Sequence, residues 1–234
     1  MTASTTLNET ELLSLLRQLG NFGPNKEGLT NVLKLGYKLD SKMLEDFASG
    51  KTSSTNSGEQ VAISIGIKPL FNTTKSKMKF AQADRVLLDG LSKPYSDFPW
   101  SRLPVVNTNH SFLSISGQMV EGDAIGNMLY GIFDDTLKTY PTIKCRENVN
   151  VTATKLLIAL KIYKMRHGKL PASLADLVPE ELSQVPMDDF DGKAFRYAPE
   201  QKLIYSVGPD LKDDGGTGFR KTSKDYDIPF KIEF

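Results

Sequence analysis

An acidic, glycine-rich loop near the C-terminus holds the residues of this 234-residue chain that are best suited to chemistry. From Tyr205 to Ile228 the sequence reads YSVGPDLKDDGGTGFRKTSKDYDI, with five aspartates and four glycines. Calcium prefers about six to eight oxygen ligands from carboxylates, backbone carbonyls and water, on a backbone flexible enough to surround it. Glycines permit the tight turns that bring carbonyls inward. The candidate calcium ligands are therefore Asp210, Asp213, Asp214, Asp225 and Asp227.

Two other interpretations of this loop stay open. In the first, the loop is an ordinary solvated turn. In the second, Asp213 and Asp214 are the catalytic carboxylates of a metal-dependent hydrolase. Adjacent residues on a glycine-rich loop, however, make a poorly preorganised acid and base pair. An EF-hand is excluded, because Lys212 and Lys221 occupy positions 3 and 12 of the loop, where that motif needs oxygen ligands. The nearby acidic segment 188–193 is interpreted as a structural turn, since Asp-Gly is a strong turn dipeptide.

Composition excludes several classes of function. The net charge of +1 argues against a nucleic-acid-binding protein, which needs a basic excess. Cys145 is the single cysteine, so the chain has neither an internal disulfide nor a cysteine-rich zinc site. No apolar run is long enough for a membrane span and no signal-peptide pattern is present, so we expect membrane attachment only through a segment absent from this chain.

Hydrophobic periodicity predicts helices over most of the first 145 residues. Asn8 followed by Glu11 is typical of a helix start, and Gly20 of its end. Further helices are expected in four segments: 29–35, 41–47, 75–93 and 119–136. This mainly helical region offers no recognisable chemistry.

The period of the hydrophobic pattern changes after a long amphipathic helix that is predicted at 149–168. Apolar residues of this helix step by four and three positions and so share one stripe: Val149, Ala153, Leu156, Leu160 and Tyr163. Three alternating segments follow, at 195–197, 203–207 and 228–234, and they predict short antiparallel strands. Pro229 cannot donate to a ladder, which places the last strand at an edge.

These patterns together predict an α+β protein of two parts. Residues 1–145 form a mainly helical region of unknown role. Residues 146–234 form a long helix packed on a small antiparallel sheet that carries the acidic loop.

The second part resembles the globular domain of the major pseudopilin of type II secretion systems. The resemblance is carried by the order of four segments: ALKIYKMRHGKLPASLADLVPEEL (159–182), VPMDDFDGKAFRY (185–197), YSVGPD (205–210) and DYDI (225–228). In that family a helix ends in a Gly and Pro turn, "Pro-x-Asp-Pro-Trp-Gly" leads to a "Tyr-x-Tyr" strand, and "Ser-Leu-Gly-x-Asp-Gly" opens a calcium loop closed by "Asp-Ile". The matching part spans about a third of the chain.

The resemblance implies specific calcium ligands. Val207 matches the position that supplies a backbone carbonyl, Asp210 the first side-chain ligand, and Asp227 the aspartate before isoleucine. The family's adjacent second aspartate falls on Tyr226, so Asp225 replaces it only through a shifted backbone. Asp213 and Asp214 have no firm counterpart and are expected as additional donors.

The function expected from the resemblance is non-enzymatic. It is that of a calcium-stabilised interaction or assembly domain in the periplasm or cell envelope, with protein partners and without a nucleic-acid or small-molecule substrate. Pseudopilins begin with an apolar membrane helix, and helical sequence without that character precedes the domain here. The hydrolase and a helical binding module with a merely solvated loop remain the alternatives.

Overall fold

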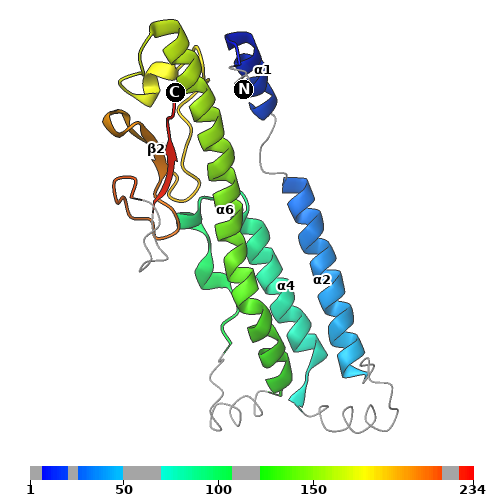
Figure 1. Ribbon diagram of the computed structural model, residues 1–234. Coiled ribbons are helices and arrows are strands. Elements are labelled where there is room, and N and C mark those ends of the chain that lie inside the picture. The colour runs from blue at the N-terminus through cyan, green and yellow to red at the C-terminus, as the bar shows by residue number, and fades with distance from the viewer. Residues whose placement is uncertain (1–6, 21–25, 50–69, 107–121, 218–226) are drawn as a thin grey trace, which may run out of the picture. The chain divides into compact units, whose positions relative to one another are not determined.

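The computed structural model describes residues 7–20, 26–49, 70–106, 122–217 and 227–234. Its longer elements are helices α1 (Glu9–Gly20), α2 (Lys26–Ala48), α4 (Thr73–Gly90) and α6 (Ala124–His167), followed by strands β1 (Arg196–Ala198), β2 (Leu203–Ser206) and β3 (Ile228–Lys231). Short 3-10 turns lie between them: η2 (Tyr95–Asp97), η3 (Trp100–Arg102), η4 (Leu174–Leu177) and η5 (Pro199–Gln201). The predicted α+β class is confirmed (Figure 1).

Two compact units divide the chain, and each contains more than one segment. Unit 1 comprises residues 1–25, 93–98 and 142–234, and unit 2 comprises residues 26–92 and 99–141. Helix α6 passes from one unit to the other, so the predicted boundary after residue 145 lies inside this helix.

Local signals determine the first helix as expected. The Asn8 side chain accepts the Glu11 N–H at 3.0 Å, and the Glu11 carboxylate accepts the Asn8 N–H at 2.8 Å. This reciprocal pair satisfies backbone donors that the first turn of a helix leaves open. Helix α1 ends at Gly20, as predicted.

Two predictions of separate helices were wrong. The segments 29–35 and 41–47 are parts of the single helix α2. Residues 119–121 of the segment 119–136 lie outside the described residues, and the rest of it from Ala124 onward belongs with the segment 149–168 to one 44-residue helix, α6. Pro141 lies inside α6, although an interior proline costs about 3 kcal/mol. Burial of Tyr130 before it and Cys145 after it offsets that cost, because each packs into its own unit. None of the helices in the described ranges has the length and apolar character of a membrane span.

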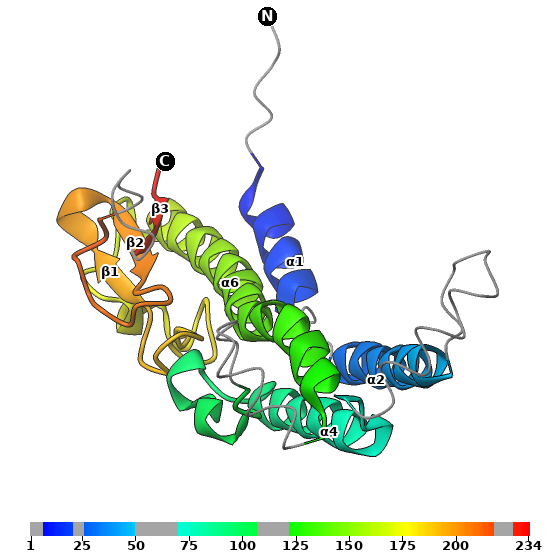
Figure 2. The ribbon, with the colours of Figure 1, turned by 90° about the horizontal axis from the view of Figure 1, so that it is seen from below.

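The core of unit 1 forms where the C-terminal part of α6 lies against the sheet (Figure 2). Four residues of the predicted stripe, Val149, Ala153, Leu156 and Leu160, are fully buried, and the fifth, Tyr163, is partly buried and packs against the same core. They pack with residues from the turns and the sheet: Leu174, Leu177, Phe190, Phe195, Ile204, Val207 and Ile232. Burial of an apolar side chain of this size contributes about 1.5 to 3 kcal/mol, so this contact holds the sheet on the helix.

The sheet is antiparallel, with the order β1-β2-β3. All four residues of the central strand β2 are buried. Strand β3 lies at an edge, where the missing N–H of Pro229 is tolerated, and the Pro229 side chain is on its exposed face. The register pairs Ser206, the last residue of β2, with Ile228, the first residue of β3. Val207 follows β2 directly, and Asp227 directly precedes β3. The sheet therefore places two of the predicted calcium ligands at the same end.

In unit 2, the buried carboxylate of Asp123 links helix α4 to helix α6. Asp123, directly before α6, accepts the Asn72 N–H at 3.0 Å and the Ser76 hydroxyl at 2.9 Å through Oδ1. Its Oδ2 accepts Lys79 Nζ at 2.7 Å. A buried charge needs such partners to be tolerated. This network connects the start of α4 to the start of α6.

A second carboxylate of unit 2 lacks that support. Asp84 on α4 has no hydrogen-bond partner for Oδ2 among the residues that the structure describes. Burial, and then the charge of Asp40 on α2, raise its pKa to about 6. Asp84 also acts on Tyr130 of α6. Burial raises the pKa of Tyr130 first, and the charges of Asp134 and Asp84 raise it further. Lys138 is paired with Asp134, and no ion pair among the described residues involves Asp84.

We expect the stability of unit 2 to fall as the pH rises from about 4 to about 6. The raised pKa of Asp84 means that the fold favours its protonated form, so the contribution is fully present below the ordinary value of 3.8 and is lost as the pH passes about 6. Because the side chain is only partly buried, we expect about 1 to 2 kcal/mol.

Asp84→Asn isolates this effect, because it keeps the shape and removes the charge. Urea unfolding at several pH values should show the variant gaining on the wild type between pH 4 and pH 7 by about 1 to 2 kcal/mol. A difference that is constant over this range would contradict the assignment to Asp84.

Candidate metal site in the loop between β2 and β3

Asp227 is the centre of the candidate site, immediately before β3. Its side chain is completely buried. Oδ2 accepts the Asp214 N–H at 3.0 Å and the Gly216 N–H at 2.7 Å. Oδ1 is buried and has no hydrogen-bond partner among the described residues. One oxygen is thus held by the loop backbone, and the other is an acceptor without a hydrogen-bond donor in the described part of the chain.

The turn around Gly215 shapes the loop toward Asp227. Gly215 and Gly216 have φ of 69° and 79°, which side chains with a Cβ rarely adopt. This conformation aims the N–H groups of Asp214 and Gly216 at Asp227 Oδ2, and the Gly215 N–H between them at Asp213 Oδ1. Converging backbone N–H groups of this kind bind anions. The sequence signal for the turn was the pair of glycines.

Electrostatics at Asp227 favour a neighbouring cation. Burial raises its pKa first, and the charges of Asp213 and Asp214 raise it further against the effect of the two N–H donors. Burial and the two neighbouring charges disfavour the ionised form of Asp227. A positive ion next to Oδ1 would favour that form instead.

Asp213 is engaged by other protein groups. Its Oδ1 accepts the Tyr205 hydroxyl at 3.0 Å and the Gly215 N–H at 3.1 Å, and its Oδ2 lies 3.7 Å from Arg196 Nε. Burial, and then the bond to Asp213, raise the pKa of Tyr205 to about 12. Asp213 therefore supports the loop, which reduces its capacity as a direct ligand.

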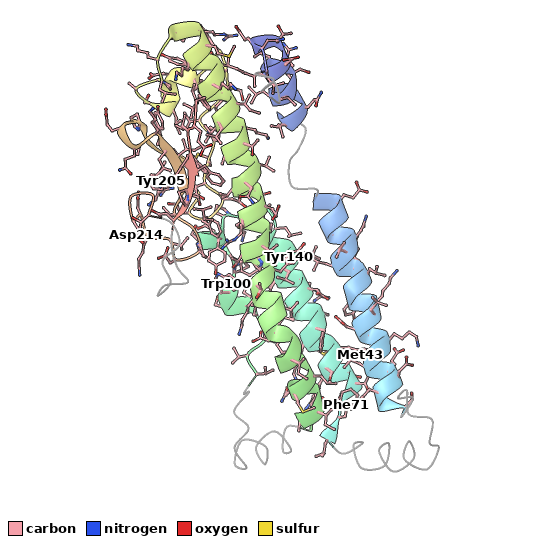
Figure 3. All side chains as sticks on the ribbon, viewed as in Figure 1. Met43, Phe71, Trp100, Tyr140, Tyr205 and Asp214 are labelled. Carbon is pink, nitrogen blue, oxygen red and sulfur yellow. The ribbon has the colours of Figure 1, made fainter. Side chains whose placement is uncertain are left out.

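The remaining predicted ligands lie in different surroundings. Asp210 is half-buried and accepts the Lys212 N–H at 3.2 Å. Asp214 has an exposed side chain, and Figure 3 labels it in the loop that follows Tyr205. Val207 is buried. Asp225 lies outside the described residues.

The described carboxylates do not converge as a set. Within the part of the chain that the structure describes, no three His, Cys, Asp or Glu side chains form a group that could hold a metal ion. Asp213 and Asp214 lie close enough to Asp227 for their charges to raise its pKa. A calcium ion here would consequently depend on backbone carbonyls and water as well as carboxylates, which its coordination allows.

Asp188 is a buried carboxylate of this region whose contacts with β2 the sequence interpretation missed. The turn expected at 188–193 is present, with the Gly192 N–H bonded to the Asp188 carbonyl at 2.8 Å and Gly192 at a φ of 69°. The Asp188 side chain, however, is fully buried and points to β2. Its partners lie up to 19 residues away, so no local pattern identifies it.

Arg196 connects this buried carboxylate to the loop. Its guanidinium forms ion pairs with Asp191 and with Asp188, and its Nε faces Asp213. Burial would raise the pKa of Asp191, but the hydrogen bonds from Arg196 and the Lys193 N–H hold it below its usual range. A continuous set of charged groups thus runs from the turn before β1 to the acidic loop.

The chain matches no protein-family model, no curated protein and no solved structure. The resemblance to pseudopilins therefore depends on the residues of this chain alone, and calcium binding stays a prediction.

Proposed function

We propose that the C-terminal part of this chain is a calcium-stabilised domain for protein interaction or assembly in the periplasm or cell envelope, related to the pseudopilins of type II secretion. The order of elements supports the proposal, since a long helix, three antiparallel strands and an acidic loop between the last two follow one another. The observation that carries it is the buried, unpartnered Oδ1 of Asp227.

The donors near Asp227 fit calcium chemically. Asp227 would contribute Oδ1. Val207, which follows the Ser206 that pairs with Ile228, would contribute its carbonyl, as the resemblance to pseudopilins implies. Asp210 and Asp214 have exposed carboxylate surface and can complete the set with water. Calcium bound there supplies positive charge to a buried carboxylate and joins the loop to the sheet. Its role in this proposal is structural.

The hydrolase alternative has less support from the geometry. Asp213, one of its two carboxylates, accepts hydrogen bonds from Tyr205 and Gly215 and faces Arg196. A general base needs a carboxylate oriented toward substrate and a companion group positioned to help. The exposed Asp214 is not held in such a position.

We expect calcium to raise the melting temperature of the full chain by about 5–10 °C over the value in EDTA. At calcium about 100 times its Kd, binding to the folded state contributes about 2.7 kcal/mol, which corresponds to several degrees for a chain of this size. Magnesium should replace calcium poorly, because it requires a smaller octahedral site.

Asp227→Asn should abolish this response, because it removes the charge and replaces one carboxylate oxygen. Asp97→Asn is the matched control, since it makes the same substitution at an exposed aspartate of unit 1 outside the loop and should leave the response unchanged. Equal melting temperatures of the wild type in calcium and in EDTA would refute the proposed function.

A further inference from the structure

We propose that Asp188 is a positioning residue for calcium, which orients the Val207 carbonyl before the ion binds. This inference rests on the proposed function, because it concerns the same calcium site. It assigns a role in metal affinity to a carboxylate that does not itself reach the metal.

The two oxygens of Asp188 hold the end of β2. Oδ1 accepts the Phe190 N–H at 3.0 Å and the Ser206 hydroxyl at 2.9 Å. Oδ2 accepts the Val207 N–H at 2.9 Å and lies 3.3 Å from Arg196 Nη1. A fully buried carboxylate with four donors is a rigid acceptor, because the surrounding groups leave it no alternative orientation.

Both peptide units that flank Val207 are connected to Asp188. The first carries the Val207 N–H, which bonds directly to Oδ2. The second carries the Gly208 N–H, which bonds to Ser206 Oγ at 3.2 Å, and that hydroxyl donates to Asp188 Oδ1. The backbone on either side of the Val207 α-carbon is thus held by one carboxylate.

This arrangement determines the direction of the Val207 carbonyl. A trans peptide is planar, and its C=O and N–H point in opposite directions. Since the Gly208 N–H points to Ser206 Oγ, the Val207 C=O points away from Ser206 and from Asp188. Gly208 permits the turn with a φ of 69°. The carbonyl is therefore oriented by protein groups rather than by the ion.

An oriented ligand strengthens metal binding because ordering costs are met during folding. Partners of metal ligands commonly change metal affinity by about 10- to 100-fold when they are removed. A purely supportive role for Asp188 would lower the stability of unit 1 and leave the affinity for calcium unchanged. The Kd for calcium therefore distinguishes a positioning role of Asp188 from a purely supportive one.

The test is calorimetric titration of the full chain with calcium chloride. Ser206→Ala disconnects the Gly208 N–H from Asp188 and keeps the other three donors of that carboxylate, so the variant should fold and bind calcium about tenfold more weakly. Asp188→Asn replaces an acceptor oxygen and should weaken binding by about 10- to 100-fold. Leu177→Ala, a core change in the same unit, controls for lost stability and should keep the wild-type Kd.

Hydrogen exchange provides a measurement on the wild type alone. In the calcium-free protein the amides of Val207 and Gly208 should already be protected, and calcium should change them little. A wild-type Kd for Ser206→Ala, or unprotected amides that calcium protects, would overturn the positioning role while leaving calcium binding intact. Absence of any binding by the wild type would instead remove the proposed function and this inference together.

Discussion

Gly126→Ala should destabilise unit 2 by about 2 to 4 kcal/mol, although alanine is ordinarily the better helix former. Gly126 lies in the first turn of α6. A Cβ at this position would collide with Ser76 Oγ and with both carboxylate oxygens of Asp123. These atoms cannot simply rotate away, because they form the buried network that joins α4 to α6.

The size of the effect follows from the burial of Asp123. Its side chain is about 1% exposed, and moving it would weaken hydrogen bonds from Asn72, Ser76 and Lys79 together. Breaking the partners of a buried charge costs several kcal/mol, more than the helix propensity of alanine returns.

Gly36→Ala is the matched control within the same unit. Gly36 lies inside α2, and a Cβ there would meet no atom within 4 Å. We expect this variant to be more stable than the wild type by about 0.5 to 1 kcal/mol, since glycine is costly in a helix interior. Urea unfolding followed by circular dichroism measures both variants, and equal stability of the two would contradict the argument from Asp123.

Gly216→Ala should destabilise the acidic loop by about 2 to 4 kcal/mol and remove the calcium response. Gly216 has a φ of 79°, where a Cβ is strained by about 1 to 2 kcal/mol. The Cβ would also collide with Leu203 Cδ2 and approach Tyr205 Cδ1 to 3.2 Å. Overpacking against a buried strand adds about 1 to 3 kcal/mol.

The effect on calcium has a direct cause. The Gly216 N–H is a donor to Asp227 Oδ2, so any shift of this residue away from β2 releases the carboxylate that the proposed site is built on. The variant should melt at the same temperature in calcium and in EDTA, in contrast to the wild type.

Gly215→Ala separates backbone strain from the collision. Gly215 has a φ of 69°, similar to that of Gly216, but a Cβ there would meet nothing within 4 Å. This variant should lose only about 1 to 2 kcal/mol and keep its calcium response. If the two alanine variants behaved alike, the contact with Leu203 and the bond to Asp227 would not matter.

Local features of this fold were predictable from the sequence, because a few neighbouring residues determine them. The hydrogen bonds between Asn8 and Glu11 span three positions, and the buried stripe from Val149 to Leu160 follows helical periodicity. The burial of β3 follows alternation, and Pro229 identifies this edge strand by its missing donor, whereas all four residues of the central strand β2 are buried.

The continuity of α6 was not predictable, because it depends on packing at both of its ends. Pro141 is a helix breaker by itself, and its position in the middle of a 44-residue helix reflects burial of residues before and after it. Local propensity does not contain this information.

For the candidate site, too, the sequence determined some features and the tertiary structure determined others. Residue types identified Asp210, Asp213, Asp214 and Asp227 as carboxylates in a loop with flexible turns, which is a property of composition and spacing. Only the tertiary structure distinguishes them: Asp227 is buried with an unpartnered oxygen, and Asp213 is engaged by Tyr205 and faces Arg196. Burial and partners at long sequence distance distinguish these carboxylates from one another, and neither is encoded in a local pattern.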